Sequence, residues 1–103
     1  MIKTNDVKII NKSQHATTEE NILMNGNILF NGTLKADEIG IYLTLIALSD
    51  EGVITKQTIY ESCAATKTEI NRILSELLLK RYIELEMIYI KDGLEQMTEL
   101  TIR

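Results

Sequence analysis

Residues 54–82 constrain the fold of this chain more than any other segment, because they contain a clearly marked helix start. Residues 66–69 read Thr-Lys-Thr-Glu, the Thr-x-x-Glu pattern of a capping box. In such a box the Thr66 hydroxyl accepts a hydrogen bond from the Glu69 N–H, and the Glu69 carboxylate accepts one from the Thr66 N–H. We therefore predict that a helix begins at Lys67.

This helix is predicted to extend to residue 81, and one side of it is apolar. The side chains at the spacing i, i+3, i+4 and i+7, which places them on one buried face, are Ile70, Ile73, Leu74, Leu77 and Leu78. A shorter helix over residues 55–64 precedes it, with Thr55 as its N-cap. Its apolar positions are Ile59, Tyr60, Cys63 and Ala64. Two short helices joined by a tight turn of small residues are the plan of a helix-turn-helix.

The other side of the second helix is polar, and every side chain on it can donate a hydrogen bond. These side chains are Lys67, Thr68, Asn71, Arg72 and Ser75. If this helix enters a major groove, Asn71 suits adenine and Arg72 suits guanine. Lys56 and Lys67 are then placed to contact phosphates. Any amphipathic helix has a solvated polar face, but the helix-turn-helix context favours DNA contact.

A helix is also predicted upstream, over residues 34–48. Thr33 is its predicted N-cap, and Asp37 and Glu38 lie in the first turn, where the helix dipole favours acids. Apolar residues occupy most of its circumference: Ile39, Ile41, Tyr42, Leu43, Leu45, Ile46 and Leu48. Such a helix either forms the centre of a three-helix domain or contributes to a subunit contact. Gly40 lowers the helix propensity and indicates a close crossing by another segment.

Residues 83–103 change from a helical to an alternating period, which indicates a β-hairpin. With Asp92 and Gly93 as the two loop residues, the pairs on the core side are Ile83 with Ile102, Leu85 with Leu100, and Met87 with Thr98. The same register places Glu86 opposite Glu99, which is unfavourable unless both are well solvated. A hairpin directly after a helix-turn-helix is a wing, and Lys91 at its tip is placed to contact a phosphate.

The residues before residue 33 are less informative. Residues 7–10 and 52–54 are predicted as short strands, and Asn25-Gly26 suits the type I′ turn of a small hairpin within residues 22–30. The alternative for that segment is an extended chain lying over the helices. We predict an α+β chain with an N-terminal arm over residues 1–32 and a winged helix-turn-helix domain over residues 33–103.

The charge distribution bears on what such a domain contacts. The net charge is −4, which argues against nucleic acid, but residues 54–82 contain five basic and three acidic side chains. That segment therefore carries +2 and the remainder −6, so a positive face on an acidic protein is compatible with DNA. The predicted wing is acidic, and its carboxylates would be repelled by phosphates along its length.

The sequence lacks the motifs of enzymes, metal sites and membrane proteins. The chain of 103 residues suits one domain, and its one cysteine, Cys63, is predicted to be a small core residue. A single cysteine favours a reducing compartment. The chain does not open with the apolar run of a signal peptide, and its apolar runs are too short to span a bilayer, so we expect a cytoplasmic protein with no membrane segment. His15 has no partner at metal-ligand spacing. No phosphate loop, nucleophile motif or His-carboxylate cluster is present, so we expect neither an enzyme nor a cofactor.

Three motifs resemble those of a known group of proteins. They are Leu34-Lys35-Ala36 at the first helix, Ile73-Leu74-Ser75-Glu76-Leu77 in the second helix of the helix-turn-helix, and Arg81-Tyr82-Ile83 at the entry to the wing. Together they look like the N-terminal winged-helix domain of DnaD-like and phage replisome-organiser proteins and of related plasmid replication initiators, although Arg81 stands where a glycine is common. The resemblance implies double-stranded DNA binding in replication initiation or transcription regulation of a bacterium, phage or plasmid.

Two functional hypotheses follow from these observations. In the first, the chain binds double-stranded DNA and works as a homodimer, because one recognition helix contacts few bases and a twofold dimer matches two half-sites. The dimer contact would use residues 22–32 and the broad apolar face of the helix at residues 34–48. In the second, the acidic wing and that helix bind a protein partner and the chain does not bind DNA.

Overall fold

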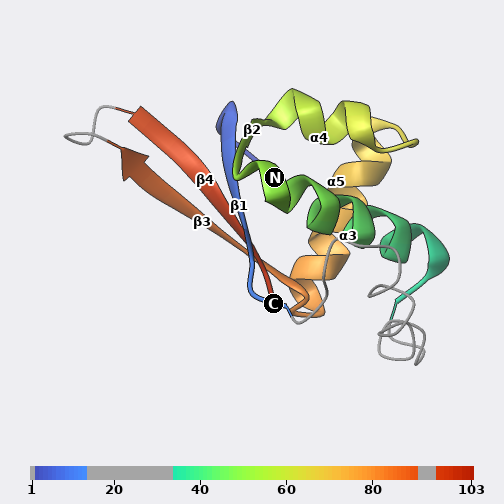
Figure 1. Ribbon diagram of the computed structural model, residues 1–103. Helices are drawn as coiled ribbons and strands as arrows, with labels where there is room; N and C mark the ends of the chain where they lie inside the picture. Colours follow the sequence, from blue (N-terminus) through green and yellow to red (C-terminus); the bar gives the residue numbers. More distant parts are fainter. Residues whose placement is uncertain (1, 14–33, 91–94) are drawn as a thin grey trace.

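A computed structural model describes residues 2–13, 34–90 and 95–103, and over these ranges the chain is α+β (Figure 1). The elements in chain order are β1 (Asp6–Asn11), α3 (Ala36–Leu48), the 3₁₀ turn η1 (Ser49–Glu51), β2 (Val53–Thr55), α4 (Lys56–Ser62), α5 (Lys67–Leu79), β3 (Ile83–Ile90) and β4 (Glu95–Ile102). Three α-helices followed by a hairpin form a winged-helix-like arrangement, as predicted. None of the described helices is long and apolar enough to cross a membrane.

The four strands form one sheet in the order β2-β1-β4-β3. β1 pairs antiparallel with β2 and parallel with β4, so that Val7 lies opposite Ile54 on one side and Thr98 on the other. The predicted strands at residues 7–10 and 52–54 are confirmed. The first part of the predicted N-terminal arm is therefore a central strand of the same sheet that contains the wing.

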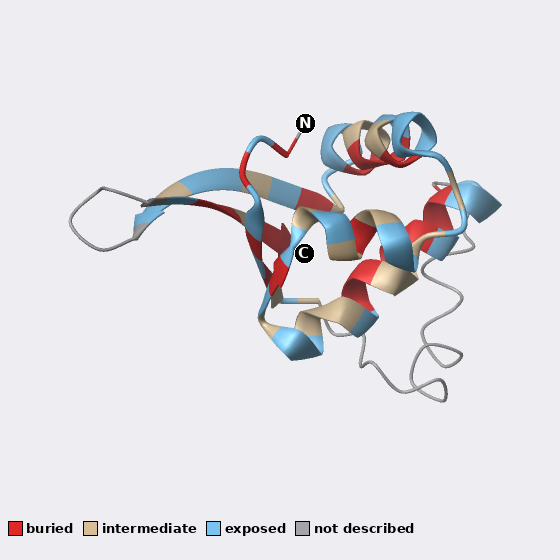
Figure 2. Cartoon of the chain, turned by 90° about the horizontal axis from the view of Figure 1, so that it is seen from above, coloured by how far each residue is buried: buried red, intermediate tan, exposed pale blue. Residues whose placement is uncertain are grey.

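The helices pack on one side of this sheet (Figure 1), and the buried residues are concentrated where the helices meet the sheet and one another (Figure 2). The side chains with almost no exposed surface include Tyr42, Leu45, Ile46, Ile59, Ile70, Leu74, Leu77, Ile83, Leu100 and Ile102. Six of the thirteen residues of α3 are buried. α3 is thus the centre of the helical layer, the first of its two predicted roles, and its Leu43 and Leu48 are half-buried.

α3 begins later than predicted. The sequence suggested Thr33 as its N-cap, but the helix starts at Ala36 and Lys35 is the N-cap, with an extended backbone. The Lys35 N–H donates to Oε1 of Glu38 at 2.8 Å, so the carboxylate at N3 satisfies the helix start. The close crossing predicted at Gly40 is not found among the described residues, because a Cβ placed there meets none of their atoms within 4 Å. Thr33 and residues 22–32 lie outside the described residues.

The two N-cap residues and the hairpin register are confirmed, but of the capping box predicted at Thr66 the structure contains only the bond to the Thr66 hydroxyl. Thr55 Oγ1 accepts from the Thr58 N–H, and Thr66 Oγ1 accepts from the Glu69 N–H, each at 3.2 Å. In the hairpin, Ile83, Leu85 and Met87 face Ile102, Leu100 and Thr98, and Glu86 faces Glu99, as predicted. The predicted turn at residues 92–93 lies outside the described residues.

α5 ends in a hydrogen-bond pattern that usually requires glycine. The Tyr82 N–H donates to the Leu77 carbonyl at 2.9 Å, and the Arg81 N–H donates to the Leu78 carbonyl at 3.1 Å. These two bonds define a Schellman motif, in which the C′ residue adopts the left-handed conformation. Arg81 occupies that position with φ of 64°. This explains why a glycine is common there, and it shows that Arg81 is held in a conformation that its Cβ disfavours.

We predict that Arg81→Gly raises the free energy of unfolding by about 1 kcal/mol, because glycine adopts the left-handed conformation without the Cβ penalty. Urea denaturation followed by circular dichroism measures this. Arg81→Ala is the matched control, since it removes the guanidinium and keeps the Cβ. An equal gain in both variants would show that the side chain, and not the backbone, is the source of the strain.

A buried carboxylate connects the start of α3 to the end of α5. The Glu38 side chain is 1% exposed, and Lys80 Nζ lies 2.9 Å from its Oε1 and 3.2 Å from its Oε2. Burial pushes the pKa of Glu38 up. The hydrogen bonds from the Lys35 N–H and from Lys80, together with the Lys80 charge, outweigh that effect and hold the pKa below its usual value.

The pH dependence of this contact can be tested with Lys80→Met, which leaves the Glu38 carboxylate without its cation. We expect a loss of about 1–3 kcal/mol in the free energy of unfolding at neutral pH, the cost of an under-satisfied buried charge. Because the folded-state pKa of Glu38 is depressed, the stabilisation is present above the unfolded-state value of about 4.3 and is lost as the pH falls through the folded-state value. The loss on mutation should therefore shrink in acid.

Urea midpoints measured from neutral to acidic pH check this expectation. Lys3→Met is the matched control, because Lys3 is exposed and forms no ion pair in the described part of the chain. A loss for Lys80→Met that stays constant down to strongly acidic pH would contradict the proposed coupling.

Candidate nucleic-acid interface

The predicted DNA-reading surface lies on α4, α5 and the turn between them. Tyr60 of α4 holds the two helices in place: its hydroxyl donates to Oδ1 of Asn71 at 3.1 Å. The Lys67 ammonium lies 5.4 Å from the centroid of the Tyr60 ring, a distance at which a cation is attracted to the ring face. The start of α5 is therefore fixed against α4 through one aromatic side chain.

The predicted readers do not all project in the same direction. Lys67, Thr68 and Arg72 are exposed, whereas Asn71 and Ser75 are half-buried. Asn71 contacts α4 through the bond to Tyr60, and the Ser75 hydroxyl donates to the Asn71 backbone carbonyl at 3.1 Å. The exposed donors of α5 are thus concentrated in its first two turns.

Arg72 has a partner that the sequence analysis missed. Its Nη2 lies 3.1 Å from Oδ2 of Asp37 in the first turn of α3, and both side chains are 52% exposed. Desolvation pushes the pKa of Asp37 up, but hydrogen bonds from Arg72 and the Glu38 N–H, and the Arg72 charge, together lower it below its usual value. Because both side chains of this ion pair are exposed to solvent, the guanidinium can exchange Asp37 for another anion at small cost.

The remaining predicted phosphate contacts are separated from this group. Lys56 at the start of α4 is half-buried, and its Nζ lies 3.4 Å from the Ile2 carbonyl. The structure therefore places it beside the segment that leads into β1. Lys91, at the tip of the hairpin, lies outside the described residues.

The outer surface of α5 changes character along its length. Leu79 follows Ser75 by four residues and Arg72 by seven, so it lies on the same side of the helix. It is 76% exposed. The first two turns of α5 thus present hydrogen-bond donors and a cation, and the last turn presents an apolar side chain. The helical spacing of the sequence contained this signal, because Leu79 falls outside the predicted buried face at residues 70, 73, 74, 77 and 78. Of that predicted face, Leu78 is wrong, since it is 37% exposed.

The wing does not extend the positive surface. Glu84 and Glu86 are exposed and Glu99 is half-buried. Of the three, Glu84 pairs with Arg103, whose Nη1 lies 3.3 Å from the Glu84 Oε1. These carboxylates lie on the side of the sheet away from the helices, as their alternation with the buried Ile83 and Leu100 requires.

Metal-ligating and nucleophilic side chains were also located in the described part of the chain. This part contains no group of three or more His, Cys, Asp or Glu side chains able to hold a metal ion. Cys63 is half-buried and packs against the core. Burial raises the pKa of its thiol, which keeps it protonated and poorly nucleophilic at neutral pH.

Comparison with known proteins places this arrangement among solved folds. No protein-family model and no curated protein matches the chain. The chain is similar in structure to the crystal structure of primosome protein DnaB (residues 1–300) from Geobacillus stearothermophilus. The TM-score is 0.65 at 12% sequence identity, over 100% of this chain and 39% of that one. The chain thus spans well under half the length of that structure, and the two share a fold.

Proposed function

We propose that this protein binds double-stranded DNA in a replication-related assembly, and that it acts by binding and not by catalysis. The observation that carries the proposal is the group of exposed donors at the start of α5, which the Thr66 cap and Tyr60 hold at the end of a tight helix-helix turn. The fold that the chain shares with part of a primosome protein supports the replication-related role.

In this proposal the first two turns of α5 lie in the major groove. The N–H groups at the helix start and the Lys67 ammonium contact a phosphate, because the positive end of the helix dipole favours an anion there. Thr68 contacts a base edge, and Arg72 leaves Asp37 to bond in a bidentate manner to guanine. Asn71 reads adenine through the part of its amide that the Tyr60 hydroxyl does not engage. Lys56 holds the backbone on the other side of the groove.

A second candidate function is supported by two features outside the donor group of α5. The sheet face away from the helices carries Glu84, Glu86 and Glu99, and exposed apolar side chains lie at the end of α5 and on β3. A winged-helix module that binds a protein partner through the acidic wing accounts for these features, and DNA binding does not.

Two substitutions distinguish base reading from phosphate contact. Arg72→Ala should cost about 1–3 kcal/mol on the preferred site and relax the sequence preference, because it removes a bidentate base contact. Lys56→Ala should weaken binding to all sequences alike and reduce the salt slope by about one unit. Gel shifts against random genomic fragments at low salt, followed by titrations on a selected site, measure both effects.

Two controls accompany this experiment. Asp37→Asn releases Arg72 without removing it, so it should preserve or strengthen binding. Arg103→Ala removes an arginine that follows β4 beside Tyr82, at the opposite end of α5 from Lys67, and should leave binding nearly unchanged. If Arg72→Ala and Lys56→Ala both bind as the parent does, α5 is not in the groove and the protein-binding module is the better description.

We also propose that the DNA-binding form is a homodimer, because one helix start contacts too few bases for useful specificity. Since α3 is largely buried within its own protomer, we expect the contact to involve residues 22–32. Sedimentation equilibrium should give twice the mass of 11.7 kDa at high protein concentration. A single species of monomer mass at the highest soluble concentration would contradict the dimer.

A further inference from the structure

One edge of the sheet has backbone groups directed away from any neighbouring strand. The Arg103 N–H donates to the Tyr82 carbonyl at 3.0 Å, a pair that continues the register in which Ile83 faces Ile102. Hydrogen-bonded and non-hydrogen-bonded pairs alternate along an antiparallel ladder, so the even-numbered residues of β3 bond to β4. The N–H and C=O groups of Leu85, Met87 and Tyr89 therefore point outward. β3 is the last strand of the sheet in the described part of the chain.

The side chains along this edge fall into two classes. On the side facing the helices, β3 presents Leu85, Met87 and Tyr89, of which Met87 is 42% and Tyr89 65% exposed. On the other side it presents Glu84 and Glu86. An edge with apolar side chains on one face and acids on the other matches a strand whose own side chains alternate between apolar and basic.

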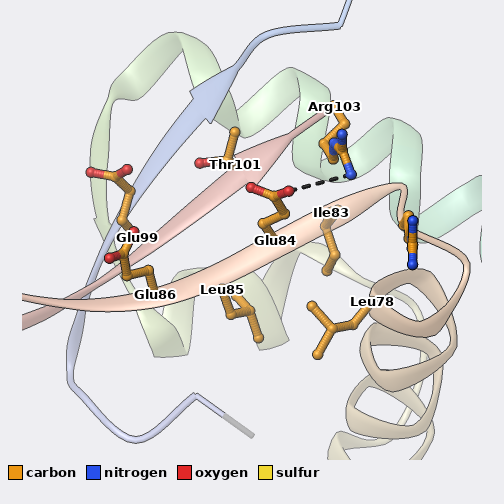
Figure 3. A pocket seen from close by; sticks show the side chains of 9 residues that line it. Leu78, Ile83, Glu84, Leu85, Glu86, Glu99, Thr101 and Arg103 are labelled. Atoms are coloured by element: carbon orange, nitrogen blue, oxygen red, sulfur yellow. Dashed lines mark ion pairs between the residues drawn. The ribbon is translucent and has the colours of Figure 1, made fainter.

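A hollow of about 480 Å³ runs beside this edge and is lined by side chains from both of its faces. Figure 3 shows Leu78 of α5 and Leu85 of β3 directed toward one another on one side of the strand, with Glu86 and Glu99 on the other. Leu78 is 37% exposed although its neighbours on the same helix face are buried. Arg81 and Arg103 also line the hollow, and Arg103 is paired with Glu84.

Two of the three acids on the outer face, Glu86 and Glu99, form no ion pair in the described part of the chain, whereas Glu84 pairs with Arg103. Glu86 and Glu99 lie directly opposite each other in the hairpin. Among the described residues neither has a Lys, Arg or His nitrogen within 4.0 Å, although Lys8 is the neighbour of Glu99 in the β1–β4 register. Like charges directly opposite are unfavourable, and a cation between them would remove the repulsion.

We propose that the free edge of β3 binds an extended segment of a partner protein in which Lys or Arg residues alternate with apolar ones. The segment adds to the sheet beside β3 and bonds to the outward backbone groups of Leu85 and Met87. Its apolar side chains contact Leu78 and Leu85, and its cation lies between Glu86 and Glu99. A second copy of this chain fits poorly, because pairing two β3 edges would bring Glu84 and Glu86 of both copies onto one face.

The proposal is tested with the full chain and a fluorescent peptide of alternating lysine and valine, by anisotropy at low salt. We expect saturable binding, and no binding of a peptide with glutamate in place of lysine. The double variant Glu86→Lys/Glu99→Lys should bind the lysine peptide at least about tenfold more weakly and should bind the glutamate peptide instead. Glu61→Lys, which adds a cation on α4, is the matched control and should behave as the parent does.

A second pair of variants tests the backbone contact. Met87→Pro removes an outward N–H without removing a bond to β4, and proline is tolerated on edge strands. It should lose the peptide while keeping the parent circular dichroism spectrum, whereas Met87→Ala, which keeps the N–H, should retain binding. Equal peptide binding by the parent and either Met87→Pro or the charge-reversed variant would overturn the proposal.

Peptide binding and DNA binding can be tested independently, because different variants affect each of them. Arg72→Ala should leave peptide affinity unchanged, and the charge-reversed variant should bind DNA at least as well as the parent because it removes repulsion. If sedimentation shows a dimer that Met87→Pro abolishes, the edge belongs to a second copy and the proposed partner is wrong.

Discussion

The parallel pairing of β1 with β4 is the contact on which the sheet depends. β2 pairs with β1, and the wing strands pair with β1 through β4, so β1 is the strand that joins the two parts in the described structure. Val7 and Ile9 direct nearly completely buried side chains into the core beside Leu100 and Ile102. The hairpin is consequently anchored to a continuous sheet and does not depend on its own two strands, which would be marginally stable alone.

The exposed cations of α5 and the carboxylates of the wing lie on different parts of this acidic protein. The cations at the start of α5 lie beside α3 and α4, while the carboxylates of β3 and β4 lie on the far side of the sheet. Asp37 holds the Arg72 guanidinium in a defined direction without burying either charge. An exposed pair of this kind positions a guanidinium at small cost and gives it up when a stronger anion arrives.

The parts of the fold that could be predicted from the sequence are those with local signals. The Thr66 cap, the helical spacing of Ile70 and Leu74, and the hairpin register each depend on residues a few positions apart, and each was confirmed. The position of β1 in the middle of the sheet has no such signal, since a parallel ladder to β4 is specified only by complementary burial of distant residues. The predicted start of α3 is wrong because Thr33 is a good N-cap by residue type. In the structure the N-cap is Lys35, whose N–H donates to the Glu38 carboxylate within the first turn of the helix.

The candidate site shows the same limit. Residue types and helix geometry identified which side of α5 is polar, but they could not show that Asn71 bonds to Tyr60 or that Arg72 pairs with Asp37. These contacts join helices whose relative placement is a tertiary property. The helical spacing alone places Leu79 outside the buried face. Its residue type does not indicate this, because Leu79 ends a run of leucines that includes the buried Leu77.

The β1–β4 ladder also has a consequence for how the chain folds. Val7 pairs with Thr98, so the central strand of the sheet finds its partner only when nearly the whole described chain has been brought together. Closing so large a loop has an entropic cost that local helix and hairpin contacts do not repay, and proteins rich in such distant contacts fold slowly. During synthesis α3, α4 and α5 are complete before β4 exists. Until β4 is made, β1 can pair with β2 but has an open edge on its other side, which makes this interval the one in which the chain is most exposed to wrong strand pairing.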